Sequence, residues 1–210
     1  MPARTRLLSA GALLLLAAVG AVGCGSSSSD PTSTVASDEP LAGGLFKPPT
    51  KEPPLQLDNS LGQPVNITDY RGKAVLVTFI YDHCPDICPL IVSNLHAAQA
   101  QLGNDAGQLQ IIAVSVDPEG DTPKTVKAFL ADHQMTGKMQ YLIGSRPQLE
   151  QVWTDWHIIT KNSSKKSDPD AVEHSALIYG ITGNGVLKTV YPANFKPKQV
   201  VHDVPILASQ

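Results

Sequence analysis

The residues with the most distinctive chemistry in this chain are two cysteines in the stretch "FIYDHCPDICP", residues 79–89. Three residues separate Cys84 from Cys88, and a proline directly follows each of them. Two thiols at this spacing are compatible with a structural disulfide, a redox-active pair or two ligands of one metal ion. A structural disulfide is the least favoured of the three, because closing so short a loop removes little entropy from the unfolded chain.

A metal site at the two cysteines needs a further ligand. Thiolates are soft ligands that bind Cu(I) and Zn(II) well, but two of them leave such an ion under-coordinated. His174 is the best placed of the six histidines, because it follows a polar stretch and precedes a predicted strand. His83, beside Cys84, is the rival ligand, while Asp86 and Asp117 are weaker candidates that ordinary turn hydrogen bonding also explains.

A strand and a helix must position the two cysteines. The apolar, β-branched run over residues 74–81 predicts a buried central strand, and residues 109–117 predict a second. The segment between them predicts a helix that ends at Gly103. A residue before proline avoids the helical region, so Cys88 is predicted at the N-cap and Pro89 at the first helical position. Because a helix N-terminus stabilises negative charge, we expect a lowered pKa at Cys88.

The remaining patterns complete an α/β fold. A strand, helix and strand at this spacing predict a parallel pair, and the apolar arms around residues 182–185 predict a β-hairpin. An earlier hairpin is predicted over residues 55–67 and a further strand over 139–144. Three further helices are predicted over residues 121–133, over 146–156 and from Lys196 onward. The sequence therefore predicts three layers, with a central mixed sheet flanked by helices. The cysteines lie beyond the carboxyl end of a central strand, where sites in open α/β sheets gather.

The N-terminal part of the chain predicts export and attachment to a membrane. Residues 1–23 combine Arg4 and Arg6 with an apolar run, which is typical of an export signal. The ending "AVGC" resembles the lipobox of bacterial lipoproteins and implies lipidation of Cys24; an uncleaved anchor helix is the alternative. Residues 24–54 are rich in Ser, Pro, Gly and Thr and predict a flexible tether, which leaves 55–210 as one domain. Both alternatives place the domain at the extracytoplasmic face of the cell membrane.

The charge balance argues against nucleic acid as a partner. Two of the 16 basic residues lie in residues 1–23, so 14 face 19 acidic residues in the remainder, a net charge near −5. Aromatic residues make up only 5% of the chain, which leaves no evident platform for stacking bases. We therefore expect no nucleic-acid partner.

Three stretches together resemble the signatures of a known family. These are "TFIYDHCPDICP", "SVDPEGDTPKTVKAFL" and "EHSALIYGITGNGVL", and they are similar to the Sco/SenC family of copper-binding proteins over nearly the whole domain. The resemblance implies a thioredoxin-like fold with the extra elements of peroxiredoxins. It also implies that Cys84, Cys88 and His174 bind copper, as Cu(I), Cu(II) or both. The family usually has Thr and a basic or polar residue before the first cysteine, where this chain has Asp82 and His83.

The same resemblance implies a metallochaperone that helps assemble the CuA centre in subunit II of cytochrome c oxidase. Other copper chaperones or thiol reductants are implied as further partners. A thiol–disulfide reductase acting on the cysteines of the oxidase copper site is the alternative, because Cys84 and Cys88 serve both roles. A redox sensor also stays open, and a thiol peroxidase is least favoured, since Tyr81 stands where its Thr or Ser is expected. His174 favours the metallochaperone over an enzyme, because a thiol exchanger has little use for it.

Overall fold

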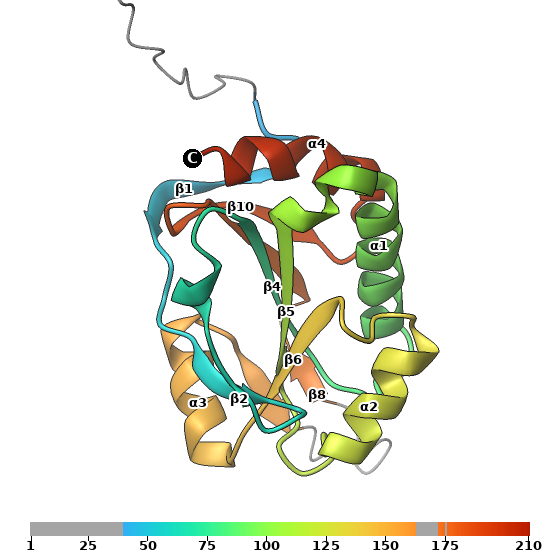
Figure 1. The fold of residues 1–210 in the computed structure, drawn as a ribbon. Helices are drawn as coiled ribbons and strands as arrows, with labels where there is room; N and C mark the ends of the chain where they lie inside the picture. The colour runs from blue at the N-terminus through green and yellow to red at the C-terminus, as the bar shows by residue number, and fades with distance from the viewer. Residues whose placement is uncertain (1–39, 163–171, 175) are drawn as a thin grey trace, which may run out of the picture. The chain divides into compact units, whose positions relative to one another are not determined.

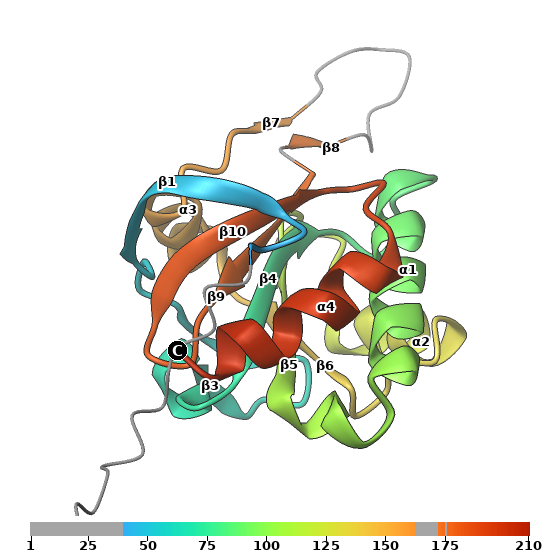
Figure 2. The ribbon, with the colours of Figure 1, turned by 90° about the horizontal axis from the view of Figure 1, so that it is seen from above.

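The computed structural model describes residues 40–162, 172–174 and 176–210. An eight-stranded mixed sheet runs in the order β1-β10-β9-β4-β5-β6-β2-β3 (Figure 1). Strands β7 and β8 form a separate two-stranded sheet (Figure 2). The strands are β1 (Gly44–Lys51), β2 (Gln56–Asn59), β3 (Pro64–Asn66), β4 (Ala74–Ile80), β5 (Leu109–Ser115), β6 (Met139–Ile143), β7 (Thr160–Asn162), β8 (Val172–His174), β9 (Leu177–Ile181) and β10 (Val186–Pro192). The α-helices are α1 (Ile87–Leu102), α2 (Pro123–Asp132), α3 (Arg146–Asp155) and α4 (Pro197–Ala208). Short 3₁₀ helices cover Ile67–Tyr70 and Gly103–Gln108.

The centre of the sheet is the parallel set β4, β5 and β6. All seven residues of β4 are buried, as its continuous apolar run predicts for a strand covered on both faces. β4 pairs with β5 in parallel from Ala74 opposite Leu109 to Ile80 opposite Ser115. Because both strands end at the same level, the loops that follow them lie at one edge of the sheet.

The helices cover both faces of this sheet and confirm the predicted three layers. Figure 1 shows α1 and α2 on one side of the central strands and α3 on the opposite side, and α4 packs against α1. On the α3 side, the Trp156 ring lies 5.7 Å from the rings of both Phe79 in β4 and Tyr179 in β9. Helix α2 begins within the predicted range of residues 121–133, where Thr122 is its cap and Pro123 its first residue.

The antiparallel half of the sheet confirms the predicted hairpin. β9 and β10 pair on either side of Thr182–Gly185, where Gly185 has a φ of 86° that favours glycine. β9 also pairs antiparallel with β4, with Ile178 opposite Thr78. The beginning of β9 therefore lies at the carboxyl end of β4.

Strand β1 corrects the predicted extent of the tether. The sequence predicts a flexible segment over residues 24–54, but Gly44–Lys51 pairs antiparallel with β10 at the edge of the sheet (Figure 2). The error arises from Pro48 and Pro49, which suggest an irregular segment although an edge strand tolerates proline. The residues of the predicted export signal, and Cys24, lie outside the described residues.

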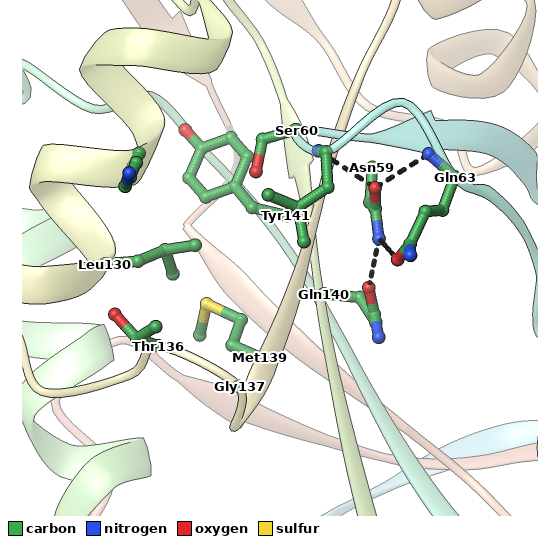
Figure 3. Close-up of a pocket in the computed structure, with 11 residues that line it drawn as sticks. Asn59, Ser60, Gln63, Leu130, Thr136, Gly137, Met139, Gln140 and Tyr141 are labelled. Atoms are coloured by element: carbon green, nitrogen blue, oxygen red, sulfur yellow. Dashed lines mark hydrogen bonds between the residues drawn. The ribbon is translucent and has the colours of Figure 1, made fainter.

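The early hairpin β2–β3 is confirmed and borders a cavity of about 310 Å³. Asn59 holds the hairpin turn: its Oδ1 accepts from the backbone N–H groups of Leu61 and Gln63, and its Nδ2 donates to Gln140 (Figure 3). The ring of Tyr141 forms part of the cavity wall. Neither Cys84 nor Cys88 lines this cavity, so it is separate from the predicted copper site.

A buried carboxylate fastens the beginning of β1 to α4. Asp203 is fully buried, and its two oxygens accept hydrogen bonds from the backbone N–H groups of Ala42 and Gly43 at 2.7 and 2.9 Å. The hydroxyl of Tyr191 donates to the same carboxylate at 2.7 Å, and Nδ1 of His202 lies 2.7 Å from it. Asp203 is therefore an acceptor shared by the backbone of residues 42–43 and the side chain of Tyr191.

We expect Asp203→Ala to lower the free energy of unfolding by about 3 kcal/mol, because the N–H groups of Ala42 and Gly43 and the hydroxyl of Tyr191 lose their shared acceptor. Urea denaturation of the full chain in detergent measures this loss. The matched control is Asp132→Asn, an exposed carboxylate at the end of α2, which should change stability by less than about 0.5 kcal/mol. Equal stability of the two variants would contradict the assignment of Asp203 as the fastening residue.

Candidate metal centre

The two cysteines lie in the turn that joins β4 to α1. The backbone N–H of Cys84 donates to the carbonyl oxygen of Tyr81 at 3.4 Å, which closes the turn. Both cysteines are reduced in this structure, and both are buried. The site is therefore a dithiol at the carboxyl end of a central strand, where the sequence places it.

The sulfur of Cys84 is the hydrogen-bond acceptor at the start of α1. The backbone N–H of Cys88 donates to Cys84 Sγ at 3.3 Å, whereas Asp86, the N-cap residue, makes no side-chain capping bond. The first N–H groups of a helix have no partner within the helix, so an outside acceptor stabilises them. Here that acceptor is a potential metal ligand.

This arrangement corrects the predicted position of Cys88. The helix begins at Ile87, which makes Cys88 the second helical residue and Pro89 the third. Proline is tolerated there because the N–H group that it lacks would have no intrahelical partner in the first turn. The preference of a residue before proline for extended backbone is outweighed at Cys88 by the start of the helix.

The pKa values of the two thiols are shifted in opposite directions, which corrects the predicted lowering at Cys88. Hydrogen bonds from the Cys88 thiol and from the backbone N–H groups of Cys88 and Asp86 lower the pKa of Cys84 to about 6, although burial opposes this. The pKa of Cys88 is raised, because its proton is held in the hydrogen bond to Cys84 and its side chain is buried. Cys84 is therefore the thiolate at neutral pH, and Cys88 is the donor that stabilises it.

His174 lies at the same end of the sheet as the cysteines. It is the last residue of β8, where its backbone pairs with that of Thr160 in β7. Three residues later β9 begins at Leu177, beside the carboxyl end of β4. Short strand β8, which is separate from β9, was not predicted. The ligand role of the His174 side chain stays a prediction.

His83, the rival ligand, lies among carboxylates. Among the described residues, it forms no hydrogen bond with either cysteine. Its Nδ1 lies 3.0 Å from Asp82 Oδ1, and its Nε2 lies 3.4 Å from Asp117 Oδ2. Burial lowers the pKa of His83, but the hydrogen bond with Asp82 and the charges of Asp117, Asp82 and Asp121 outweigh this effect and raise it. The structure thus places Asp117, which follows β5, beside His83.

Asp121 is a residue whose role the sequence interpretation missed. Thr122 makes the cap of the following helix, whereas Asp121 is buried. Its Oδ1 accepts from the backbone N–H of Asp82 at 2.9 Å, and its Oδ2 accepts from the Tyr141 hydroxyl at 2.9 Å. Burial raises the pKa of Asp121 to about 7, against the lowering effect of these hydrogen bonds. Only the pairing of β4 with β5 brings Asp82 and Asp121 together, so no local pattern could reveal the contact.

Within the described ranges, no helix has the length and apolar character needed to cross a membrane.

The fold and the dithiol define a class of thioredoxin-like proteins whose paired cysteines follow a central strand. Within this class the chain belongs to the SCO1/SenC family, whose family model matches residues 46–209. This match covers the cysteine turn, β8 and every α-helix of the structure, and it confirms the resemblance seen in the sequence.

Several known proteins are similar to this chain. Protein SCO2 homolog, mitochondrial, from Bos taurus is 31% identical over 139 residues, which cover 65% of this chain and 52% of the relative. The chain thus spans about half the length of these curated relatives. Among solved structures, ScoI of Bradyrhizobium japonicum with copper bound is 30% identical, with a TM-score of 0.67 over 75% of this chain and 99% of the other.

Two further structures share the fold. BsSco, described as a member of the Sco family of cytochrome c oxidase assembly proteins with a disulfide switch, is 25% identical, with a TM-score of 0.64 and coverage of 80% and 98%. A SCO1/SenC family lipoprotein from Bacillus anthracis is 24% identical, with a TM-score of 0.65 and coverage of 78% and 99%.

The unequal acidities predict a pH titration of the reduced protein. In a full chain with Cys24→Ser, the ultraviolet absorbance of thiolate should rise with a midpoint near pH 6, and only Cys84→Ala should abolish this step. Cys88→Ala should raise the midpoint, because the largest stabilising hydrogen bond disappears. The folded-state pKa lies below the value of about 8.5 in an unfolded chain, so the free energy of unfolding should rise from about pH 6 to about pH 8.5. This gain should be lost as the pH falls through 6.

A first thiolate midpoint near 8.5, or one that Cys88→Ala leaves in place, would contradict the assignment of Cys84 as the stabilised thiolate. Near-ultraviolet circular dichroism of each variant checks that the fold is retained during the titration.

Proposed function

We propose that this chain is a copper-binding assembly factor that delivers copper to the CuA centre of cytochrome c oxidase. The observation that carries the proposal is the buried dithiol at the start of α1, with one sulfur already favouring the thiolate. Membership in the SCO1/SenC family supports it, as do the copper-bound ScoI structure and the oxidase-assembly description of BsSco.

The donor set suits copper. Cys84 offers a soft thiolate near neutral pH, and Cys88 becomes a second one when its proton leaves as the metal binds. His174 supplies the third ligand in this proposal, since it ends β8 only three residues before β9, which begins beside the carboxyl end of β4. Three protein ligands leave a coordination position open, which transfer of the ion to another protein requires.

The environment of the dithiol also suits a site that releases its metal. The backbone N–H of Cys88 donates to Cys84 Sγ, which withdraws electron density from a sulfur that would bind copper. Cys88 is fully buried, whereas Cys84 retains 6% exposure, so an approaching partner meets Cys84 first. Ligand exchange with a target would therefore begin at Cys84.

Copper titration of the reduced full chain in detergent, without oxygen and against a Cu(I) chelator, tests the proposal. We expect one tightly bound equivalent, a loss of tight binding in Cys84→Ser and Cys88→Ser, and at least about tenfold weaker binding in His174→Ala, or about 1.4 kcal/mol. The matched control is His157→Asn, an exposed residue whose φ of 55° asparagine tolerates; its affinity should equal that of the wild type.

Absence of specific copper binding, together with a Cys84–Cys88 disulfide that exchanges rapidly with thiols, would overturn the proposal in favour of a thiol–disulfide reductase. Binding that His174→Ala leaves unchanged would remove His174 from the ligand set.

We also propose that lipidated Cys24 anchors the domain to the extracytoplasmic face of the cell membrane. The lipobox-like ending of the export signal supports this, and so does the relative described as a lipoprotein. We expect Cys24→Ser to abolish incorporation of labelled fatty acid in cells and to block cleavage of the signal. Equal fatty-acid labelling of the variant and the wild type would contradict lipidation at Cys24, and an unlabelled wild type that stays in the membrane fraction would favour the uncleaved anchor.

A further inference from the structure

A second group of metal-ligating side chains lies beside the dithiol, on two loops. Asp82 and His83 follow β4, while Asp117 and Asp121 follow β5. The parallel pairing of β4 with β5 brings these loops together, and the backbone N–H of Asp82 donates to Asp121 Oδ1 at 2.9 Å. One potential ligand atom from each of Asp82, His83 and Asp121 lies within 4.8 Å of the others.

One carboxylate oxygen in this group lacks a partner. The side chain of Asp82 is only 6% exposed; its Oδ1 lies 3.0 Å from Nδ1 of His83, but its Oδ2 is buried without a hydrogen-bond partner in the described structure. Leaving such an oxygen unsatisfied costs stability, so a buried orphan requires an explanation. A cation bound to Asp82 Oδ2 would satisfy it.

The surroundings of this oxygen are short of positive charge. Of the described Lys, Arg and His residues, His83 makes the ion pairs found for Asp82 and Asp117. The nearby Arg146 is engaged with Glu119 and Glu150 instead. One imidazole therefore stands among three carboxylates, and a bound cation would neutralise the excess negative charge.

The backbone and the neighbouring side chains are arranged around these groups. Tyr141 donates to Asp121 Oδ2 at 2.9 Å and fixes that carboxylate. A Cβ at Gly120 would come within 2.6 Å of His83 Cε1 and 2.3 Å of Asp117 Oδ2, so only glycine allows the loop to approach so closely. With Nδ1 of His83 turned to a metal, Nε2 keeps Asp117 as its carboxylate partner, which is the usual support of a metal-bound histidine.

We propose that Asp82, His83 and Asp121 form a second cation site, distinct from the dithiol, for a divalent first-row metal ion such as Cu²⁺ or Zn²⁺. Oxygen and imidazole donors suit such divalent ions, whereas the thiol pair suits Cu(I). Metal–ligand bonds of about 2.0–2.2 Å place ligand atoms up to about 4.4 Å apart, so small side-chain rotations convert the observed cluster into a coordinating one. This site goes beyond the proposed copper delivery and does not depend on the thiols.

Titration with Co²⁺ alone tests the second site, using the full chain in detergent with Cys84→Ser and Cys88→Ser to remove the thiol ligands. We expect one equivalent bound, with ligand-field bands of oxygen and nitrogen donors and no sulfur charge-transfer band. Asp82→Asn and His83→Gln should each weaken binding at least tenfold, and Zn²⁺ should displace the Co²⁺. The matched control is Glu119→Gln, which removes one negative charge from an exposed side chain of the same loop and should leave the affinity unchanged.

Absence of Co²⁺ binding, or an affinity that Asp82→Asn and His83→Gln leave unchanged, overturns the second site. If the double cysteine variant does not fold, the same titration is made on the wild type with Cys84 and Cys88 oxidised to a disulfide. Failure here leaves copper binding by the reduced dithiol untouched, because that binding is measured with Cu(I) and depends on different side chains.

Discussion

The hydrogen bond from the Cys88 N–H to the Cys84 sulfur links the start of α1 to the chemistry of the dithiol. A helix that begins directly after a buried strand must find acceptors for its first N–H groups, and here a side-chain sulfur provides one. The same bond lowers the pKa of Cys84, and the thiol of Cys88 lowers it further by donating a hydrogen bond to the Cys84 sulfur. The turn between β4 and α1 therefore has one geometry that serves both the fold and the acidity of the site.

The parallel register of β4 and β5 has a similar double role. It closes the centre of the sheet, and it also sets the loop of Asp82 and His83 against the loop of Asp117 and Asp121. Tyr141, which comes from the next parallel strand β6, reaches the same place with its hydroxyl. Soft thiols and hard carboxylates thus lie close together at one edge of the sheet, and among the described residues no hydrogen bond joins the two groups. Thiolates favour Cu(I), whereas carboxylate and imidazole donors favour divalent ions.

Much of this arrangement could be predicted from the sequence, because it rests on patterns within single segments. The buried run of β4, the Thr122–Pro123 start of α2 and the Thr182–Gly185 hairpin each carry their signal locally. Three features could not be predicted in this way. Strand β1 is held by β10 and Asp203 rather than by its own proline-rich sequence; the start of α1 depends on a sulfur four residues before Cys88; and Asp121 gains its partners only when distant loops meet.

Strand β1 also determines how the sheet ends. Pro48 and Pro49 deprive this edge strand of two N–H donors, and the opposite edge, β3, is only three residues long. Both edges of the eight-stranded sheet are therefore poor templates for pairing with a further strand, which protects against edge-to-edge aggregation. A partner protein would then have to recognise this domain through its loops and helix ends rather than by extending its sheet.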